Sequence, residues 1–125
     1  MLFRSDDGST GVSEILALSV DSFLVLERTT NKEDGNVVRL FLATTGGTSS
    51  DIKNTRELKS EKYIPLQKKL LLDFSKIKVK KTDNIEGMTW GYPIGNKKTI
   101  LFISDNNFKE TQVTQLILFE WVNGE

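Results

Sequence analysis

Seven short apolar runs separated by turn residues constrain the fold of this chain more than any other feature. The runs are rich in β-branched and aromatic residues and are bounded by Gly, Asn, Asp or Thr, a pattern typical of β-strands. No convincing helical period interrupts them, although Ser50–Lys59 is compatible with a short helical turn. The sequence predicts strands over Val12–Leu18, Ser22–Arg28, Val37–Thr44, Lys69–Phe74, Ile85–Gly91, Thr99–Asp105 and Thr114–Trp121.

The runs fall into two similar units. Each unit has a glutamate near the start of its first strand, polar residues ending a very apolar second strand, and a polar residue entering an apolar third strand. These positions are Glu14, Glu27, Arg28 and Arg39 in the first unit and Glu86, Ser104, Asp105 and Gln115 in the second. Two meanders of one pattern predict an all-β fold resembling two blades of a β-propeller. Two unrelated antiparallel meanders would look much the same.

Composition narrows the possible chemistry. The chain has 125 residues, 38% of them hydrophobic, which predicts one domain over residues 1–125. It has no cysteine and no histidine, which excludes thiolate chemistry and Ser-His-Asp catalysis. The sequence shows no signal-peptide core and no apolar run long enough to span a membrane. We therefore expect no membrane partner, and the residues indicate no particular compartment.

Charge is balanced overall but unevenly placed. The 17 basic and 17 acidic residues cancel, yet residues 52–81 hold ten Lys and Arg against three Asp and Glu. A solvated loop and an edge strand protected by lysines explain this stretch best; a polyanion-binding patch is the weaker alternative. With no nucleic-acid-binding motif in the chain, we expect no nucleic-acid partner. Residues 45–67 form the long polar and basic connection between the two units.

Two clusters of oxygen-bearing residues stand at strand ends. Asp83, Asn84 and Glu86 open one strand, and Gly87 would permit a close backbone approach or a bulge that redirects Glu86. The residues Ser104–Asn107 end another strand. Carboxylates and amides grouped on loops can bind Ca²⁺. Each cluster is also compatible with an ordinary turn, because Asp and Asn bond their own backbone.

Charged residues also flank the buried runs of the first unit. Glu14 or Glu27 could form structural ion pairs with Arg28 or Arg39, since charges beside buried runs are rarely left unpaired. The alternative is that both arginines bind a phosphate or carboxylate substrate.

Taken in order, these motifs resemble those of a known family. The segments DNIEGMTWG (83–91), KTILFISDNNF (98–108) and TQVTQLILFE (111–120) resemble the C-terminal part of the phytase-like family, described as "esterase-like activity of phytase". The upstream segments GVSEIL (11–16), FLVLER (23–28) and VRLFL (38–42) fit the preceding part of that family. The resemblance covers residues 11–121.

The resemblance implies a propeller-like fold in which the first strand of each blade lines a channel. It would place Glu14 and Glu86 near the channel mouth, with Glu27, Arg28 and Ser104–Asn107 on neighbouring strand ends. In true β-propeller phytases, carboxylates at this mouth hold Ca²⁺. Family members are longer, so this chain resembles only the C-terminal portion. We therefore expect uncovered sheet faces that favour self-association or a partner.

The leading expectation is a phytase-like, esterase-like hydrolase domain acting on phosphate or carboxylic esters with the help of Ca²⁺. The alternative is a non-catalytic, propeller-derived binding or assembly module. The expected catalytic residues are Glu86 and Asp105; the metal ligands are Asp83, Glu86, Asp105 and Glu14; the substrate-binding residues are Arg28, Arg39, Asn84 and Asn106.

Overall fold

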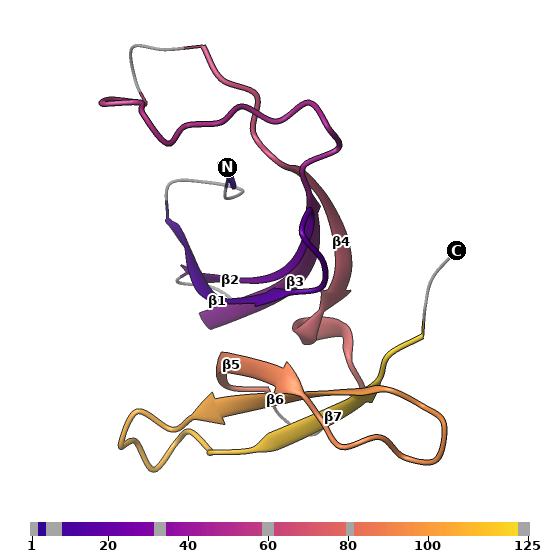
Figure 1. Cartoon of the computed structure of the whole chain (residues 1–125). Coiled ribbons are helices and arrows are strands. Elements are labelled where there is room, and N and C mark those ends of the chain that lie inside the picture. Colours follow the sequence, from indigo (N-terminus) through magenta and orange to yellow (C-terminus); the bar gives the residue numbers. More distant parts are fainter. Residues whose placement is uncertain (1–2, 5–8, 32–34, 59–61, 80–81, 123–125) are drawn as a thin grey trace.

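Two antiparallel sheets make up the described part of the chain. The computed structural model describes residues 3–4, 9–31, 35–58, 62–79 and 82–122 (Figure 1). The first sheet has the order β1-β2-β3-β4 and the second β5-β6-β7. The strands are β1 (Thr10–Ala17), β2 (Ser22–Asn31), β3 (Gly35–Thr44), β4 (Gln67–Asp73), β5 (Asn84–Trp90), β6 (Thr99–Asp105) and β7 (Leu116–Glu120). The prediction of an all-β fold is therefore confirmed, and its two successive meanders are the arrangement that propeller blades have.

Two local predictions need correction. Phe74 was expected to end a strand but begins a short 3-10 helix, η1 (Phe74–Lys76). The Asp73 carboxylate accepts a hydrogen bond of 3.0 Å from the backbone N–H of Ser75, and this cap turns the chain.

The expected helical turn is also absent from the described residues 50–58, which form turns and irregular structure. Two hydrogen bonds join the beginning of this segment to Ile64. Ser50 N donates to Ile64 O at 2.8 Å, and Ile64 N donates to the Ser50 hydroxyl at 2.6 Å. The described residues between β3 and β4, 45–58 and 62–66, form no helix or strand, and Figure 1 shows them beyond the first sheet.

The hydrophobic core lies between the two sheets. Alternate residues of a strand face opposite sides, and one face of each sheet supplies the core. The buried cluster consists of Leu24, Leu26, Val38 and Leu40 from the first sheet, Phe74 from η1, and Ile85, Met88, Ile100 and Phe102 from the second sheet. The rings of Phe74 and Phe102 meet edge to face, with centroids 5.0 Å apart. Helix η1 thus fills the junction where the chain passes from one sheet to the other.

The internal repeat is visible in the strand register. Glu27 lies opposite Arg39, and the corresponding Ser104 donates its backbone N–H to Gln115 O at 3.0 Å. Both first strands contain a register shift, between Val12 and Glu14 in β1 and between Ile85 and Gly87 in β5. The extra residues are therefore Ser13 and Glu86. Ser13, rather than Glu14, occupies the place in β1 that Glu86 occupies in β5.

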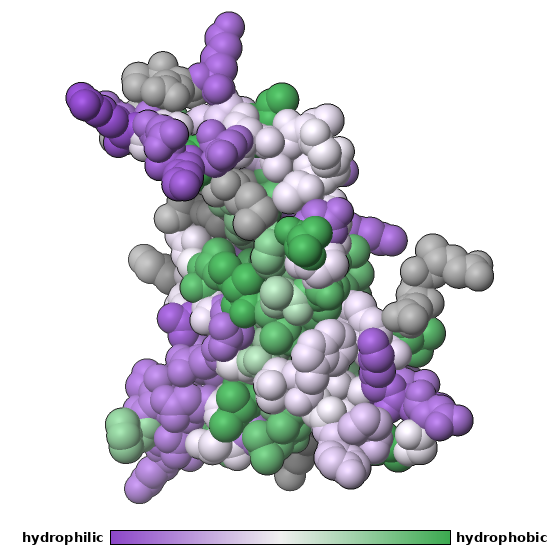
Figure 2. Space-filling view, in the orientation of Figure 1, coloured by the Kyte–Doolittle hydropathy of each residue, from purple (hydrophilic) through white to green (hydrophobic). Residues whose placement is uncertain are grey.

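Hydrophilic and hydrophobic residues occupy different parts of the surface. Figure 2 shows hydrophilic side chains over the connection beyond the first sheet, and hydrophobic surface across the middle of this face. Within the described ranges, no helix has the length and apolarity needed to cross a bilayer.

Candidate functional site

The strongest cluster of polar side chains lies where β1 and β2 meet β5. Arg28, on β2, lies opposite Val38 and therefore on the core-facing side of the first sheet. Its Nη1 donates to Asn84 Oδ1 and lies 3.3 Å from Glu86 Oε1. Asn84 is fully buried and its Nδ2 donates to the same Glu86 oxygen. One buried amide thus fixes both an arginine and a carboxylate that come from different sheets.

The bulge in β5 explains how Glu86 reaches this position. Ile85 pairs with Ser104 and Gly87 pairs with Ile103, so Glu86 is the extra residue of the strand. A Cβ atom on Gly87 would lie 2.9 Å from the Ile103 side chain, closer than real Cβ contacts allow. Gly87 therefore supports both features expected of it from the sequence, a close approach and a bulge.

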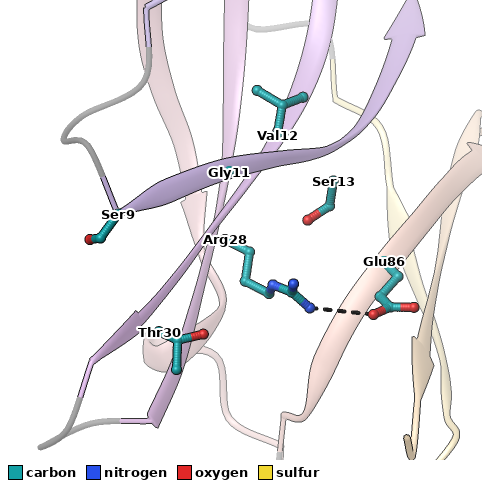
Figure 3. A pocket seen from close by; sticks show the side chains of 7 residues that line it. All are labelled: Ser9, Gly11, Val12, Ser13, Arg28, Thr30 and Glu86. Atoms are coloured by element: carbon teal, nitrogen blue, oxygen red, sulfur yellow. Dashed lines mark hydrogen bonds and ion pairs between the residues drawn. The ribbon is translucent and has the colours of Figure 1, made fainter.

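A polar pocket of about 440 Å³ opens at this junction. Its lining residues are Ser9, Gly11, Val12, Ser13, Arg28, Thr30 and Glu86. Figure 3 shows the Arg28 side chain extending from β2 toward Glu86 on β5. Three hydroxyl groups, one guanidinium and one carboxylate surround the same space. Such a lining suits a small polar or anionic ligand.

Arg28 has N–H donors that form no hydrogen bond with the described residues. A guanidinium carries five N–H donors, and the contacts of Arg28 with described residues use Nη1 alone. Its side chain is 39% exposed. The groups on Nε and Nη2 can therefore bind a carboxylate or phosphate oxygen while Nη1 stays on Asn84 and Glu86.

Glu27 and Arg39 belong to the opposite face of the first sheet and do not line the pocket. Lys68 Nζ lies 2.9 Å from Glu27 Oε1, and Arg39 Nε lies 3.2 Å from Asp73 Oδ2. The ion pairs considered from the sequence are therefore corrected: Glu27 pairs with Lys68, Arg39 with Asp73, and Arg28 with Glu86. Burial raises the pKa of the Asp73 carboxyl, but hydrogen bonds from Ser75 and then Arg39 outweigh burial, so its pKa lies below the usual value.

The carboxylates expected to hold Ca²⁺ are not gathered together. Asp83 Oδ2 accepts a hydrogen bond of 2.8 Å from Val113 N, and Glu14 Oε1 accepts one of 2.9 Å from Ile15 N. Asp105 lies opposite Asn84 in the sheet but does not line the pocket. Among the described residues, no group of three or more acidic side chains could hold a metal. Because Glu86 also faces the Arg28 cation, these residues do not fit a Ca²⁺ ion.

Asn106 lies in a turn. Its Oδ1 accepts a hydrogen bond of 3.1 Å from Phe108 N, and Asn107 and Phe108 both have left-handed backbone angles, with φ of 49° and 55°. The neighbouring Ser104 is buried and donates its hydroxyl to Val113 O at 2.9 Å. The turn interpretation of this cluster accounts for both residues.

Sequence reasoning missed four polar residues that matter in the structure. Ser9, Ser13 and Thr30 line the pocket, and Lys68 is the partner of Glu27. The sequence repeat pointed to Glu14 instead, and only the bulges in both first strands make Ser13 the counterpart of Glu86. Lys68 was grouped with the solvated lysines of a basic stretch, and nothing in its spacing distinguished it from them.

The fold is thus two antiparallel meanders that share a hydrophobic core, with a polar pocket at their junction. The comparison with protein families is more specific, because the model of the phytase-like family, "Esterase-like activity of phytase", matches residues 1–108. The chain belongs to this family. The match ends before the segment at 111–120 that also contributed to the sequence resemblance. No curated protein and no solved structure matches the chain.

Proposed function

We propose that the chain is a hydrolase domain that binds phosphate or carboxylic esters in the Arg28–Glu86 pocket. The observation that carries the proposal is the arginine at this junction, held on one nitrogen by Asn84 and Glu86 and with its other donors unengaged by described residues. An ester of either class develops negative charge on oxygen as water attacks it. A guanidinium that is already oriented stabilises that charge. Membership of the phytase-like family supports the same reaction class.

The roles of the residues follow from their contacts. Glu86 lines the pocket and can accept the proton of an attacking water, while Arg28 binds the substrate oxygens. Asn84 is a positioning residue, because it is buried and bonds to both side chains. No step is assigned to Ca²⁺. The catalytic role expected for Asp105 and the substrate-binding roles expected for Arg39 and Asn106 stay predictions.

Replacing Arg28 by Gln tests the proposal directly. We expect phosphate binding to weaken by roughly ten- to one-hundred-fold, the range for losing a charge-assisted hydrogen bond of about 1.5–3 kcal/mol. Hydrolysis of p-nitrophenyl phosphate or p-nitrophenyl acetate should fall at least as much. Isothermal titration with phosphate and a chromogenic assay measure the two effects.

Arg39→Gln is the matched control, since it removes the same charge from the opposite face of the sheet. Equal losses in both variants would contradict the proposal, because Arg39 does not line the pocket. Glu86→Gln and Asp105→Asn complete the series. Unchanged hydrolysis in Glu86→Gln would exclude this carboxylate as the base.

One observation favours a non-catalytic binding module instead. Glu86 is already paired with Arg28 and accepts a hydrogen bond from Asn84 on the same oxygen, Oε1, so this oxygen is engaged rather than available to an attacking water. Phosphate binding that depends on Arg28, without turnover of either ester, would establish this second function.

A calcium titration tests whether the chain binds Ca²⁺, as the family resemblance implies, or does not, as the dispersed carboxylates indicate. A ligand that binds only the folded state raises Tm by mass action. Because the predicted ligands are dispersed, we expect millimolar Ca²⁺ to shift Tm no more than Mg²⁺ does. A Ca²⁺-selective rise that disappears in Glu86→Gln would contradict this expectation and restore a metal to the pocket.

A further inference from the structure

The second sheet has an open edge where the first sheet has a strand. The repeat equates β5, β6 and β7 with β1, β2 and β3, and β4 pairs with β3 in the first sheet. Among the described residues, no strand occupies the corresponding place beside β7, which pairs with β6 alone. The outer edge of β7 is therefore a position for another strand.

Hydrogen bonds at the two ends of β7 reveal which backbone groups face that edge. Ser104 N donates to Gln115 O at 3.0 Å, and Trp121 N donates to Lys98 O at 2.8 Å. Backbone groups in an antiparallel pair alternate between the two sides of a strand, so the odd-numbered residues of β7 bond to β6. The N–H and C=O groups of Leu116, Leu118 and Glu120 therefore point to the open edge.

β7 lacks the features that protect the other edges of the two sheets. β1 and β5 are both bulged, and they contact each other at the junction of the sheets. β4 carries Lys68 and Lys69 and has an irregular register against β3. β7 reads Leu-Ile-Leu-Phe-Glu, with a regular register and no lysine or proline. Leu116 and Leu118 are 65% and 48% exposed, so this edge invites pairing.

An apolar groove runs beside the same edge. It has a volume of about 520 Å³ and lies between β4 and β7 on the core side of the second sheet. Leu71 and Leu72 line it from β4, and Phe119 and Trp121 line it from β7 and the residue that follows. A strand added to β7 would also extend the apolar wall of this groove.

We propose that β7 pairs antiparallel with β7 of a second copy of the chain, about a two-fold axis at Leu118. In this register Leu118 faces its own counterpart and Leu116 faces Glu120 of the other copy. All three edge-facing residues then exchange backbone hydrogen bonds, so the edge is complementary to itself. The two three-stranded sheets become one continuous sheet, with Ile117 and Phe119 of each copy turned toward the groove side. A second copy is the occupant because, in this register, each N–H at the edge meets a C=O of the other copy and each C=O meets an N–H.

Introducing a charge at the two-fold axis tests this pairing. The wild-type chain should elute as a dimer of 28.2 kDa, twice its 14.1 kDa, in light scattering after size exclusion. Leu118→Lys and Leu118→Glu should each be monomeric, because like charges would meet at the axis. Mixing the two variants should restore the dimer, which a folding defect could not do. Ile15→Lys is the matched control, an exposed strand residue on β1 of the other sheet, and should remain dimeric.

The register can be checked with a single thiol, because the natural chain has no cysteine. Facing residues of a hydrogen-bonded pair have Cα atoms about 5.5 Å apart, within the range that a disulfide spans. Leu118→Cys should crosslink to a dimer on mild oxidation, whereas Ile15→Cys should not. A monomeric wild type at 100 μM (a chosen test concentration), or a mixture of the Lys and Glu variants that stays monomeric, would overturn the proposal.

Discussion

Replacing Lys68 by Met is expected to lower the free energy of unfolding by about 3–5 kcal/mol. Glu27 is only 2% exposed, and among the described residues its carboxylate is paired with Lys68 alone, at 2.9 Å. Methionine keeps the packing of the side chain against Phe41, over whose ring the Lys68 ammonium lies at 4.2 Å. The variant would therefore lose the charge while leaving a buried carboxylate without its cation. Urea unfolding at neutral pH measures the loss.

Two comparisons isolate the buried ion pair. Lys97→Met removes a lysine from the Lys97–Glu120 pair, in which both side chains are substantially exposed, and should change stability by less than about 1 kcal/mol. Combining Lys68→Met with Glu27→Gln removes the uncompensated charge and should recover a substantial part of the lost stability. Equal effects of the two lysine substitutions would mean that burial of Glu27 contributes nothing to the cost.

Phe102→Ala should destabilise the chain by a comparable amount, about 3–5 kcal/mol. Phe102 is 1% exposed and contacts both Phe74 and Phe119 edge to face, with centroid distances of 5.0 and 5.7 Å. Its removal would leave a cavity in the core that joins the two sheets. Both sheets should consequently melt together, at a lower temperature. Tryptophan fluorescence, which reports Trp90 and Trp121, should coincide with circular dichroism.

Phe108→Ala is the control for this variant. Phe108 is fully exposed in the turn after β6, so its truncation should change stability by no more than about 0.5 kcal/mol. Two separate transitions in the wild type, or a small effect of Phe102→Ala, would show that the sheets are stabilised independently.

The sequence was sufficient to predict the strands because both meanders are built from local patterns. Apolar runs such as Leu40–Ala43 and Ile100–Ile103 lie between turn residues. The short connections from β1 to β2 and from β2 to β3 favour pairing of neighbouring strands, whereas β3 and β4 pair across a long one. Phe74 was misassigned because its apolar character suits a strand as well as a core-filling 3-10 turn. The cap decides between them, and the hydrogen bond from Ser75 N to the Asp73 carboxylate that makes it is seen in the structure.

The sequence identified the residues of the candidate site but not the contacts between them. Glu86, Asn84 and Arg28 were all singled out, since polar residues at the ends of apolar strands are conspicuous. Arg28 contacts Asn84 and Glu86, which lie 56 and 58 positions further along the chain. These contacts depend on how one sheet is stacked on the other. Strand alternation fixes the face on which a side chain lies, but it does not specify the element that covers that face. For that reason Arg39 and Arg28 looked equivalent in the sequence and lie on opposite sides of the sheet.

The shared core between the sheets has a consequence for synthesis on the ribosome. Leu24 and Leu26 share one buried cluster with Ile85 and Ile100, which are translated roughly sixty to seventy-five positions later. The first meander therefore emerges with one apolar face uncovered, and it gains its cover only after β5 and β6 have left the exit tunnel. Nascent chains are most exposed to aggregation during such intervals. The lysines of residues 62–79, which are translated within this interval, flank the apolar β4 with charge and so oppose aggregation until the second sheet arrives.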